Sequence, residues 1–145
     1  MFRLSKKADY AIVALSHLHA TQKPTSAKAI ASSYDLSAQM LANVLKSLTS
    51  AGILESKRGV AGGYILGKDP GNITVGEVID VIDGPSSFSD CTDISKTCRA
   101  DRLCPAKKPV ILIHKRIKYF MDSISLQDIV SDDAFPELSF TFNNR

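Results

Sequence analysis

The three cysteines of this 145-residue chain, Cys91, Cys98 and Cys104, fall within 14 residues and are separated by six and then five residues. A zinc site is usually built on a pair of ligands about two to four residues apart, and these cysteines include no such pair. Three thiolates on one loop suit an iron–sulfur cluster, which proteins hold chiefly through cysteine. The spacing alone also leaves open zinc, a thiol redox switch and a purely structural role.

Three cysteines leave a four-coordinate site one ligand short, so the site would be labile or would take a ligand from elsewhere in the protein. A thiol switch would need a stabilised thiolate, and Lys96, Arg99 and Arg102 supply positive charge in the same loop. An odd number of cysteines argues against a disulfide framework. The cysteine loop is therefore predicted to be functional, with an iron–sulfur cluster favoured.

Positive charge is concentrated in two parts of the chain, although the whole chain carries a net charge of only +3. Residues 1–68 contain nine Lys or Arg against three acidic residues, and residues 96–118 contain eight against one. Residues 69–95 contain six acidic residues and no Lys or Arg. A basic N-terminal module fits a polyanionic partner such as double-stranded DNA, with an ordinary solvated surface as the alternative.

Several helices and one hairpin are predicted in the N-terminal part of the chain, before the cysteines. Apolar periodicity with Ser5, Ser26 or Thr25, Ser37 and Thr74 as N-caps predicts four helices. A glycine-rich tip between two strand-like runs predicts a hairpin in the middle of the chain. The expected segments are a helix from residue 6 that ends before 23–24, helices over 27–33 and 38–51, strands over 53–57 and 64–66, and a helix over 75–84.

This order of elements is that of a winged helix-turn-helix, so we predict a mainly α-helical fold with a small β-hairpin wing. The third helix would enter the major groove and read bases through polar residues at its N-terminal end. Arg58 on the hairpin tip could enter the minor groove or clamp phosphate. A winged helix used only for protein contacts is the alternative. The candidate base contacts are Ser37, Gln39, Met40 and Asn43, and the candidate phosphate contacts are Lys28 and Lys46.

A long helix after Pro105 is predicted to form the dimer interface, because its apolar residues step by three and four over about two heptads. Two subunits would then read a near-palindromic operator, whereas packing within one chain is the alternative. The residues of this seam are Val110, Ile113, Ile117, Phe120 and Ile124. The predicted domains are 1–84 (DNA binding), 85–104 (cysteine-rich loop), 105–131 (dimerisation helix and a short terminal helix) and 132–145 (flexible tail).

The sequence also argues against several classes of protein. It has no uncharged apolar run long enough to cross a membrane, and Asp9 precedes the short apolar run 11–15, which disfavours a signal peptide. A cytoplasmic protein without a membrane partner is therefore expected. There is no glycine-rich phosphate loop and no Ser/His/Asp order, so we predict that the chain is not an enzyme, with a cysteine-dependent enzyme as a remote alternative.

Over roughly residues 1–130 the chain resembles the bacterial Rrf2 family of winged-helix regulators, the IscR/NsrR group. The motifs are Phe2-Arg3-Leu4-Ser5 with Asp9-Tyr10-Ala11, Leu45–Leu48 with Gly52-Ile53, Arg58-Gly59-x-x-Gly62-Gly63-Tyr64-x-Leu66, the three cysteines, and Ile124-Ser125-Leu126-x-Asp128. The resemblance implies a homodimeric transcription regulator, usually a repressor, with an iron–sulfur cluster on the cysteine loop. Family members sense nitric oxide, iron or cluster supply, and they control cluster-assembly or stress genes.

The resemblance also implies roles for single residues. The family's DNA contacts match the same residues of the third helix and Arg58, and Arg3 matches a contact to the DNA backbone. The IscR branch uses a histidine ligand three residues after the last cysteine, where this chain has Lys107, a poor ligand. The NsrR branch takes an aspartate from the partner subunit, which matches Asp9 and favours a 4Fe–4S over a 2Fe–2S cluster. The alternative role of Asp9 is a first-turn acid that the helix dipole favours.

Overall fold

The computed structural model describes residues 3–85, 89, 91–92 and 103–131. Cys98, most of the predicted cysteine-rich loop and the predicted tail 132–145 lie outside the described residues. The elements are α1 (Lys6–Thr21), α2 (Ala27–Ser33), α3 (Ala38–Ser50), β1 (Leu54–Lys57), β2 (Gly63–Leu66), a 3-10 turn η1 (Pro70–Asn72), α4 (Val75–Asp83), α5 (Lys107–Ser123) and α6 (Leu126–Val130). Among the helices that the structure describes, none combines the length and hydrophobicity that crossing a membrane requires.

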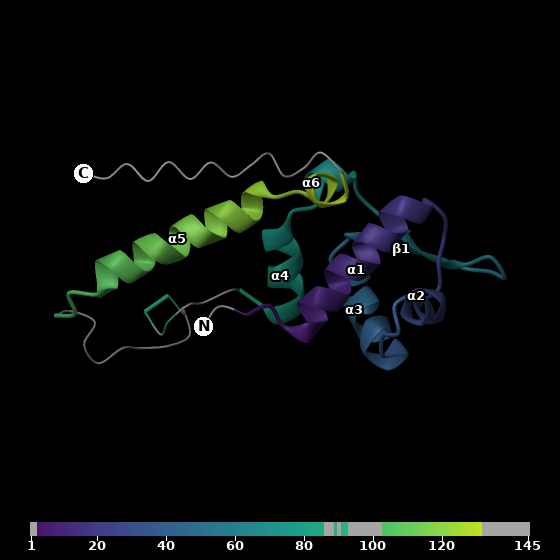
Figure 1. Cartoon of the computed structure of the whole chain (residues 1–145), viewed down its shortest axis with the longest axis horizontal. Coiled ribbons are helices and arrows are strands. Elements are labelled where there is room, and N and C mark those ends of the chain that lie inside the picture. The colour runs from purple at the N-terminus through teal and green to yellow at the C-terminus, as the bar shows by residue number, and fades with distance from the viewer. Residues whose placement is uncertain (1–2, 86–88, 90, 93–102, 132–145) are drawn as a thin grey trace.

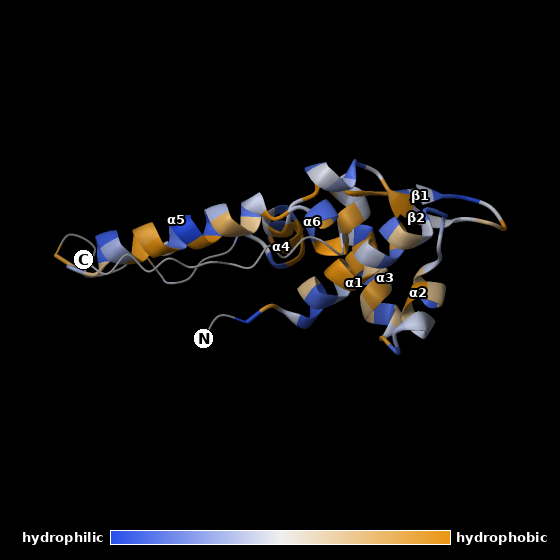
Figure 2. Ribbon diagram, turned by 45° about the horizontal axis from the view of Figure 1, so that its top comes forward, coloured by the Kyte–Doolittle hydropathy of each residue, from blue (hydrophilic) through white to orange (hydrophobic). Residues whose placement is uncertain are grey.

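The first four helices, the hairpin and α6 surround one apolar core, while α5 extends away from it (Figure 1). The apolar sides of α1, α3 and α4 turn toward this core (Figure 2). All four residues predicted for the buried face of α3 are buried, namely Leu41, Val44, Leu45 and Leu48. The predicted winged helix-turn-helix fold is therefore confirmed.

The helices begin at the polar residues that the sequence marks as N-caps. The Ser5 hydroxyl accepts the Ala8 N–H at 3.0 Å, and the Thr74 hydroxyl accepts the Glu77 N–H at 3.1 Å. Of the two candidates for α2, Ser26 is the cap, with its hydroxyl 3.2 Å from the Ala29 N. These bonds satisfy N–H groups that have no partner within the helix, which sets where each helix starts.

The wing is an antiparallel hairpin in which Leu54 pairs with Leu66 and Lys57 with Gly63. The predicted first strand starts one residue too early, because the Ile53 N–H donates to Leu48 O at 3.0 Å and so closes the end of α3. A contact that the sequence did not predict ties the wing to the start of α2. Thr25 and Tyr64 exchange two backbone hydrogen bonds, at 3.1 and 2.9 Å.

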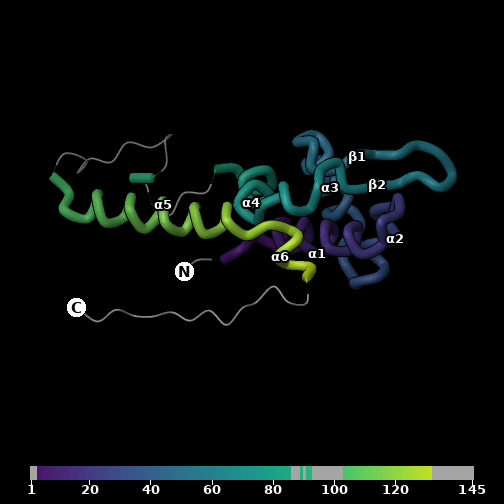
Figure 3. Tube along the Cα trace, turned by 90° about the horizontal axis from the view of Figure 1, so that it is seen from above, coloured from purple at the N-terminus to yellow at the C-terminus, as the bar shows by residue number. Residues whose placement is uncertain are grey.

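The chain after α5 pairs with the segment at the start of α4. The Val75 N–H donates to Ile124 O at 2.9 Å, and the Leu126 N–H donates to Ile73 O at 2.7 Å. Leu126, whose side chain is buried, is the first residue of α6, which follows α5 closely (Figure 3). The far end of α5 and the hairpin lie at opposite ends of the molecule (Figures 1 and 3).

An ion-pair network holds α5 against α4. The Lys118 ammonium lies 2.8 Å from a carboxylate oxygen of Asp80 on α4 and 2.6 Å from one of Asp122 on α5 itself. Gly76 of α4 lies directly beneath the Asp122 carboxylate, where a Cβ would collide with it. The glycine therefore lets the two helices approach closely at this point.

Candidate DNA interface, cysteine loop and dimer face

The exposed side of α3 carries the predicted base-reading residues. Gln39, Asn43 and Lys46 are exposed, and their spacing of four and three residues places them on one stripe opposite the buried face. Ser37 is also exposed and caps the helix, with its hydroxyl 3.4 Å from the Met40 N. Met40 differs from the others because it is half-buried and packs against the core. The structure thus presents amide and hydroxyl groups at the N-terminal end of a protruding helix, the arrangement that can read base edges.

The hairpin presents a second basic surface. Arg58 is exposed immediately after β1, whereas the neighbouring Lys57 is held by Glu55 in an ion pair of 2.9 Å. Lys28 on α2 and Arg3 before α1 are also exposed. Exposed cations around a protruding helix can contact the phosphates on either side of a groove.

One contact at this surface was not predicted from the sequence. The hydroxyl of Tyr10, on α1, accepts the backbone N–H of Ser37 at 3.2 Å, between residues 27 positions apart. The Tyr10 ring is 7% exposed, and the Lys6 ammonium lies 5.8 Å from its centroid. A buried tyrosine needs a partner for its hydroxyl, but the sequence does not say which group this is.

The two described cysteines are free, half-buried thiols at the two ends of the cysteine loop. The Cys91 sulfur lies 3.2 Å from the Ser89 hydroxyl oxygen, and Cys104 lies three residues before α5. Asp9 is exposed in the first turn of α1. Within the part of the chain that the structure describes, no three His, Cys, Asp or Glu residues are grouped as metal ligands, and Cys98 lies outside that part. The proposed ligand set thus stays a prediction.

The predicted seam on α5 is divided between two sides of the helix. Val110 and Ile117 on α5 and Ile124 just after it are half-buried, whereas Ile113 and Phe120 are 55% and 51% exposed. The exposed pair is extended by Leu112 and Tyr119, which are 53% and 77% exposed. Seven residues make about two helical turns, so Leu112 aligns with Tyr119 and Ile113 with Phe120, in two rows on either side of the exposed Arg116. We call Leu112, Ile113, Tyr119 and Phe120 the α5 apolar strip.

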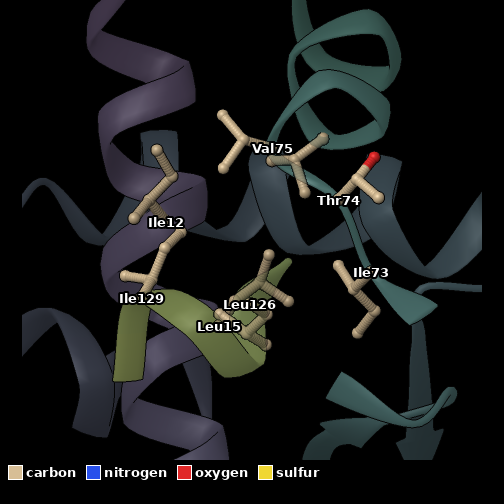
Figure 4. Close-up of a pocket in the computed structure, with 8 residues that line it drawn as sticks. Ile12, Leu15, Ile73, Thr74, Val75, Leu126 and Ile129 are labelled. Atoms are coloured by element: carbon tan, nitrogen blue, oxygen red, sulfur yellow. The ribbon is translucent and has the colours of Figure 1, made fainter. Parts of the chain in front are cut away.

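A small apolar pocket lies where α6 meets α1 and α4 (Figure 4). Its volume of about 10 Å³ is room for about one water, which is too little for an effector molecule. The pocket marks the seam through which α6 is anchored to the body. The lining residues are Ile12, Leu15, Ile73, Thr74, Val75, Val78, Leu126 and Ile129.

Comparison with known proteins agrees with this geometry. A family model described as "Rrf2: Iron-dependent Transcriptional regulator" matches residues 4–132. The transcriptional regulator CymR of Bacillus subtilis is 34% identical over 133 residues, covering 89% of this chain and 90% of CymR. The transcriptional regulator IscR of Xenorhabdus nematophila is 31% identical, covering 90% of this chain and 80% of IscR.

The solved structures give the same result. The structure of CymR, titled the global cysteine regulator of B. subtilis, has a TM-score of 0.72 and 32% identity, covering 90% of this chain and 97% of CymR. The structure of T. potens IscR has a TM-score of 0.70 and 31% identity, covering 89% of this chain and 86% of IscR. These relatives are all named transcriptional regulators, which is consistent with the prediction that the chain is not an enzyme. The chain belongs to the Rrf2 family of winged-helix transcriptional regulators.

Proposed function

We propose that this protein is a cytoplasmic, homodimeric DNA-binding transcription regulator, a repressor, that senses through an iron–sulfur cluster. Its targets would be genes of cluster assembly, iron supply or nitrosative and oxidative stress. The observation that carries the DNA-binding part is the stripe of Gln39, Asn43 and Lys46 on the exposed side of α3. The cluster and the dimer have separate support and separate tests.

In this proposal α3 reads bases and the wing anchors the protein to the backbone. Gln39 and Asn43 can each form two hydrogen bonds with an adenine edge, and Ser37 can donate its hydroxyl proton while still accepting the Met40 N–H. Met40, half-buried, would offer only its outer end to a thymine methyl group. Arg58, Arg3, Lys28 and Lys46 would contact phosphate or the minor groove.

Arg58→Ala tests the role of the wing. After an operator is selected from a random DNA pool, we expect this variant to bind it about ten-fold more weakly, because a direct cation–DNA contact is lost. Lys57→Ala is the matched control, since Lys57 is the neighbouring cation and already pairs with Glu55. Equal affinities for Arg58→Ala and the unaltered protein would refute the role of Arg58.

For the cluster, we propose that Cys91, Cys98 and Cys104 are three ligands and that Asp9, from the partner subunit, is the fourth. The donor set fits an iron–sulfur group, because thiolates are its preferred ligands and both described cysteines are free. The family description as iron-dependent adds support. When bound, such a cluster supplies an iron centre that nitric oxide, oxygen or iron shortage can alter.

The test is an ultraviolet–visible spectrum of protein purified without oxygen, together with iron and sulfide counts per monomer. About four irons and a broad band near the visible edge indicate a 4Fe–4S cluster, and Asp9→Ala should then make it more labile. About two irons with structured bands indicate a 2Fe–2S cluster and a different fourth ligand. Cys98→Ser should abolish the colour while the protein stays folded, and an unchanged spectrum would refute the assignment.

The second candidate is a regulator without a cluster, which responds to thiol chemistry or binds zinc. It is favoured by the likeness to CymR, whose structure is described as that of the global cysteine regulator of B. subtilis. Protein that stays colourless after anaerobic reconstitution, and whose operator affinity changes with thiol oxidation, would establish this candidate instead.

The dimer proposal is supported by the α5 apolar strip. No residue of α5 is buried, and the strip exposes two aromatic and two aliphatic side chains around Arg116. Exposed apolar area of this kind is unfavourable in water, and a second copy of the same strip would cover it. Two winged helices held in this way would read two half-sites of a near-palindromic operator.

A further inference from the structure

A side chain of α1 makes a direct hydrogen bond to the N-cap residue of the recognition helix. Tyr10 is buried in the core, and its hydroxyl is the acceptor for the Ser37 N–H at 3.2 Å. Ser37 is the N-cap of α3, with an extended backbone of φ −66° and ψ 109°. The N–H of an N-cap residue lies outside the helical hydrogen-bond ladder, so α3 provides no partner for it.

The position of this bond matters because α3 begins there. Ser37 and Gln39 lie within the first turn, and the segment before them is a tight turn in which Asp35 has a φ of +52°. A non-glycine residue in this left-handed region requires the surrounding structure to hold it. The Leu36 N–H is held by Ala31 O at 2.9 Å, on the side of α2, so the Tyr10 bond holds the same turn from the side of α1.

We propose that Tyr10 is a positioning residue for sequence recognition: its hydroxyl fixes the N-terminal end of α3 so that Ser37 and Gln39 meet the base edges. The inference rests on the proposed DNA-binding function and adds to it a residue that does not touch DNA. Direct readout depends on hydrogen-bond geometry, so a small displacement of the helix end would weaken base contacts. Phosphate contacts by flexible Lys and Arg side chains would tolerate the same displacement.

Tyr10→Phe separates positioning from packing, because it keeps the ring and removes only the hydroxyl. We expect operator affinity to fall about five- to ten-fold, while affinity for unrelated DNA and the salt dependence of binding stay unchanged. A role in packing alone would leave the ratio of specific to non-specific affinity at its original value. Tyr34→Phe is the comparison, since that exposed hydroxyl lies 3.1 Å from His17 Nδ1 and so joins α1 to the same turn without reaching Ser37. It should keep the ratio of specific to non-specific affinity.

The outcomes are distinguishable. If the unaltered protein selects no operator, the proposed function fails and the inference fails with it. If it selects an operator and Tyr10→Phe keeps the full specificity ratio, only the inference is overturned. If Tyr10→Phe does not fold, amide hydrogen exchange in the unaltered protein decides, because slow exchange of the Ser37 N–H supports the bond and fast exchange overturns it.

Discussion

Ser37 combines a structural role with a proposed DNA contact. Its hydroxyl accepts the Met40 N–H and so caps α3, and the same hydroxyl is a predicted base contact. Ser37→Ala should therefore lower the free energy of unfolding by about 0.5–2 kcal/mol and also weaken operator binding. Ser26→Ala, which removes the cap of α2, is the control and should cost stability without changing sequence preference. Urea denaturation and operator titration measure the two effects, and equal operator binding by Ser37→Ala would contradict the proposed contact.

Asp128 makes the anchoring of α6 sensitive to acid. Hydrogen bonds from the Ser125 hydroxyl and then from its backbone N–H hold the pKa of Asp128 below its usual value, against a smaller opposing effect of burial. A lowered pKa means that the bond stabilises the fold above the pKa of the unfolded chain. This stabilisation is lost as the pH falls through the lower, folded pKa.

Asp128→Asn should therefore be less stable than the unaltered protein at neutral pH, and the difference should shrink in acid as Asp128 itself becomes protonated. Melting temperatures of both proteins, measured between about pH 7 and 3, give this difference. The other titratable groups are the same in both proteins, so their effects drop out of the difference. Asp69→Asn is a control, because Asp69 lies in another turn and accepts only the Gly71 N–H. A stability difference that is independent of pH would contradict the role of the carboxylate.

At the residue scale, exposure was easier to predict than contact. Gln39, Asn43 and Arg58 are exposed as the sequence predicted, because helical periodicity and hairpin position determine which residues face outward. The Tyr10–Ser37 hydrogen bond joins two helices across 27 positions. No local pattern encodes such a bond, since it depends on how α1 and α3 cross.

Among the elements, the contact between α4 and α5 depends on the absence of a side chain at one position, Gly76. Burial lowers the pKa of Lys118, but its hydrogen bonds to Asp122 and Asp80 outweigh this and leave the pKa above its usual value. Gly76 leaves room for the Asp122 carboxylate that takes part in this network. The closeness of the two helices and the charge network thus depend on each other.

Gly76→Ala should destabilise the protein, although alanine favours a helix over glycine by about 1 kcal/mol. The added methyl group would push Asp122 away from Lys118, and we expect a net loss of about 1–3 kcal/mol. The double variant Gly76→Ala with Asp122→Ala removes the contacts with the carboxylate and leaves only the backbone nitrogen of residue 122, at 3.1 Å from the added Cβ. It should recover part of this loss, as a double-mutant cycle in urea would show. If Gly76→Ala alone is more stable than the original protein, the close approach of α4 and α5 at this position is contradicted.

Helix α5 shows what apolar periodicity does and does not predict. The sequence predicted its existence and start near Pro105, and the structure places it over Lys107–Ser123. Apolar residues occupy a wide arc of this helix, and the pattern cannot tell which part of the arc α4 covers. As a result Ile113 and Phe120 remain exposed while the rest of the predicted seam is half-buried.

For the whole molecule, the main prediction is that two copies of the chain associate through the α5 apolar strip. The double variant Ile113→Glu with Phe120→Glu should be monomeric, because burying two carboxylates in an apolar interface is strongly unfavourable. It should also bind a two-half-site operator at least ten-fold more weakly, since half of the contacts are lost. Light scattering after size-exclusion chromatography measures the mass.

The control for this prediction is Val60→Glu, which places a carboxylate on a fully exposed apolar residue at the wing tip. This variant should remain dimeric, although its DNA affinity should fall by repulsion of phosphate. An Ile113→Glu, Phe120→Glu protein that keeps the dimer mass would place the interface elsewhere. Circular dichroism of both variants checks that the winged helix remains folded.

The bridge between Thr74 and Ser125 has a consequence for how such a protein can change over evolutionary time. Two backbone hydrogen bonds there join the start of α4 to the start of α6, so the segment made of α4, the cysteine loop and α5 begins and ends at one place. Lengthening a loop whose ends are already pinned costs little, because closure entropy grows only slowly with length. Residues that follow α4 in this segment can therefore be exchanged, inserted or lost, while α4 keeps its packing in the core with the DNA-reading elements. One architecture can in this way be adapted to a new signal without a new fold.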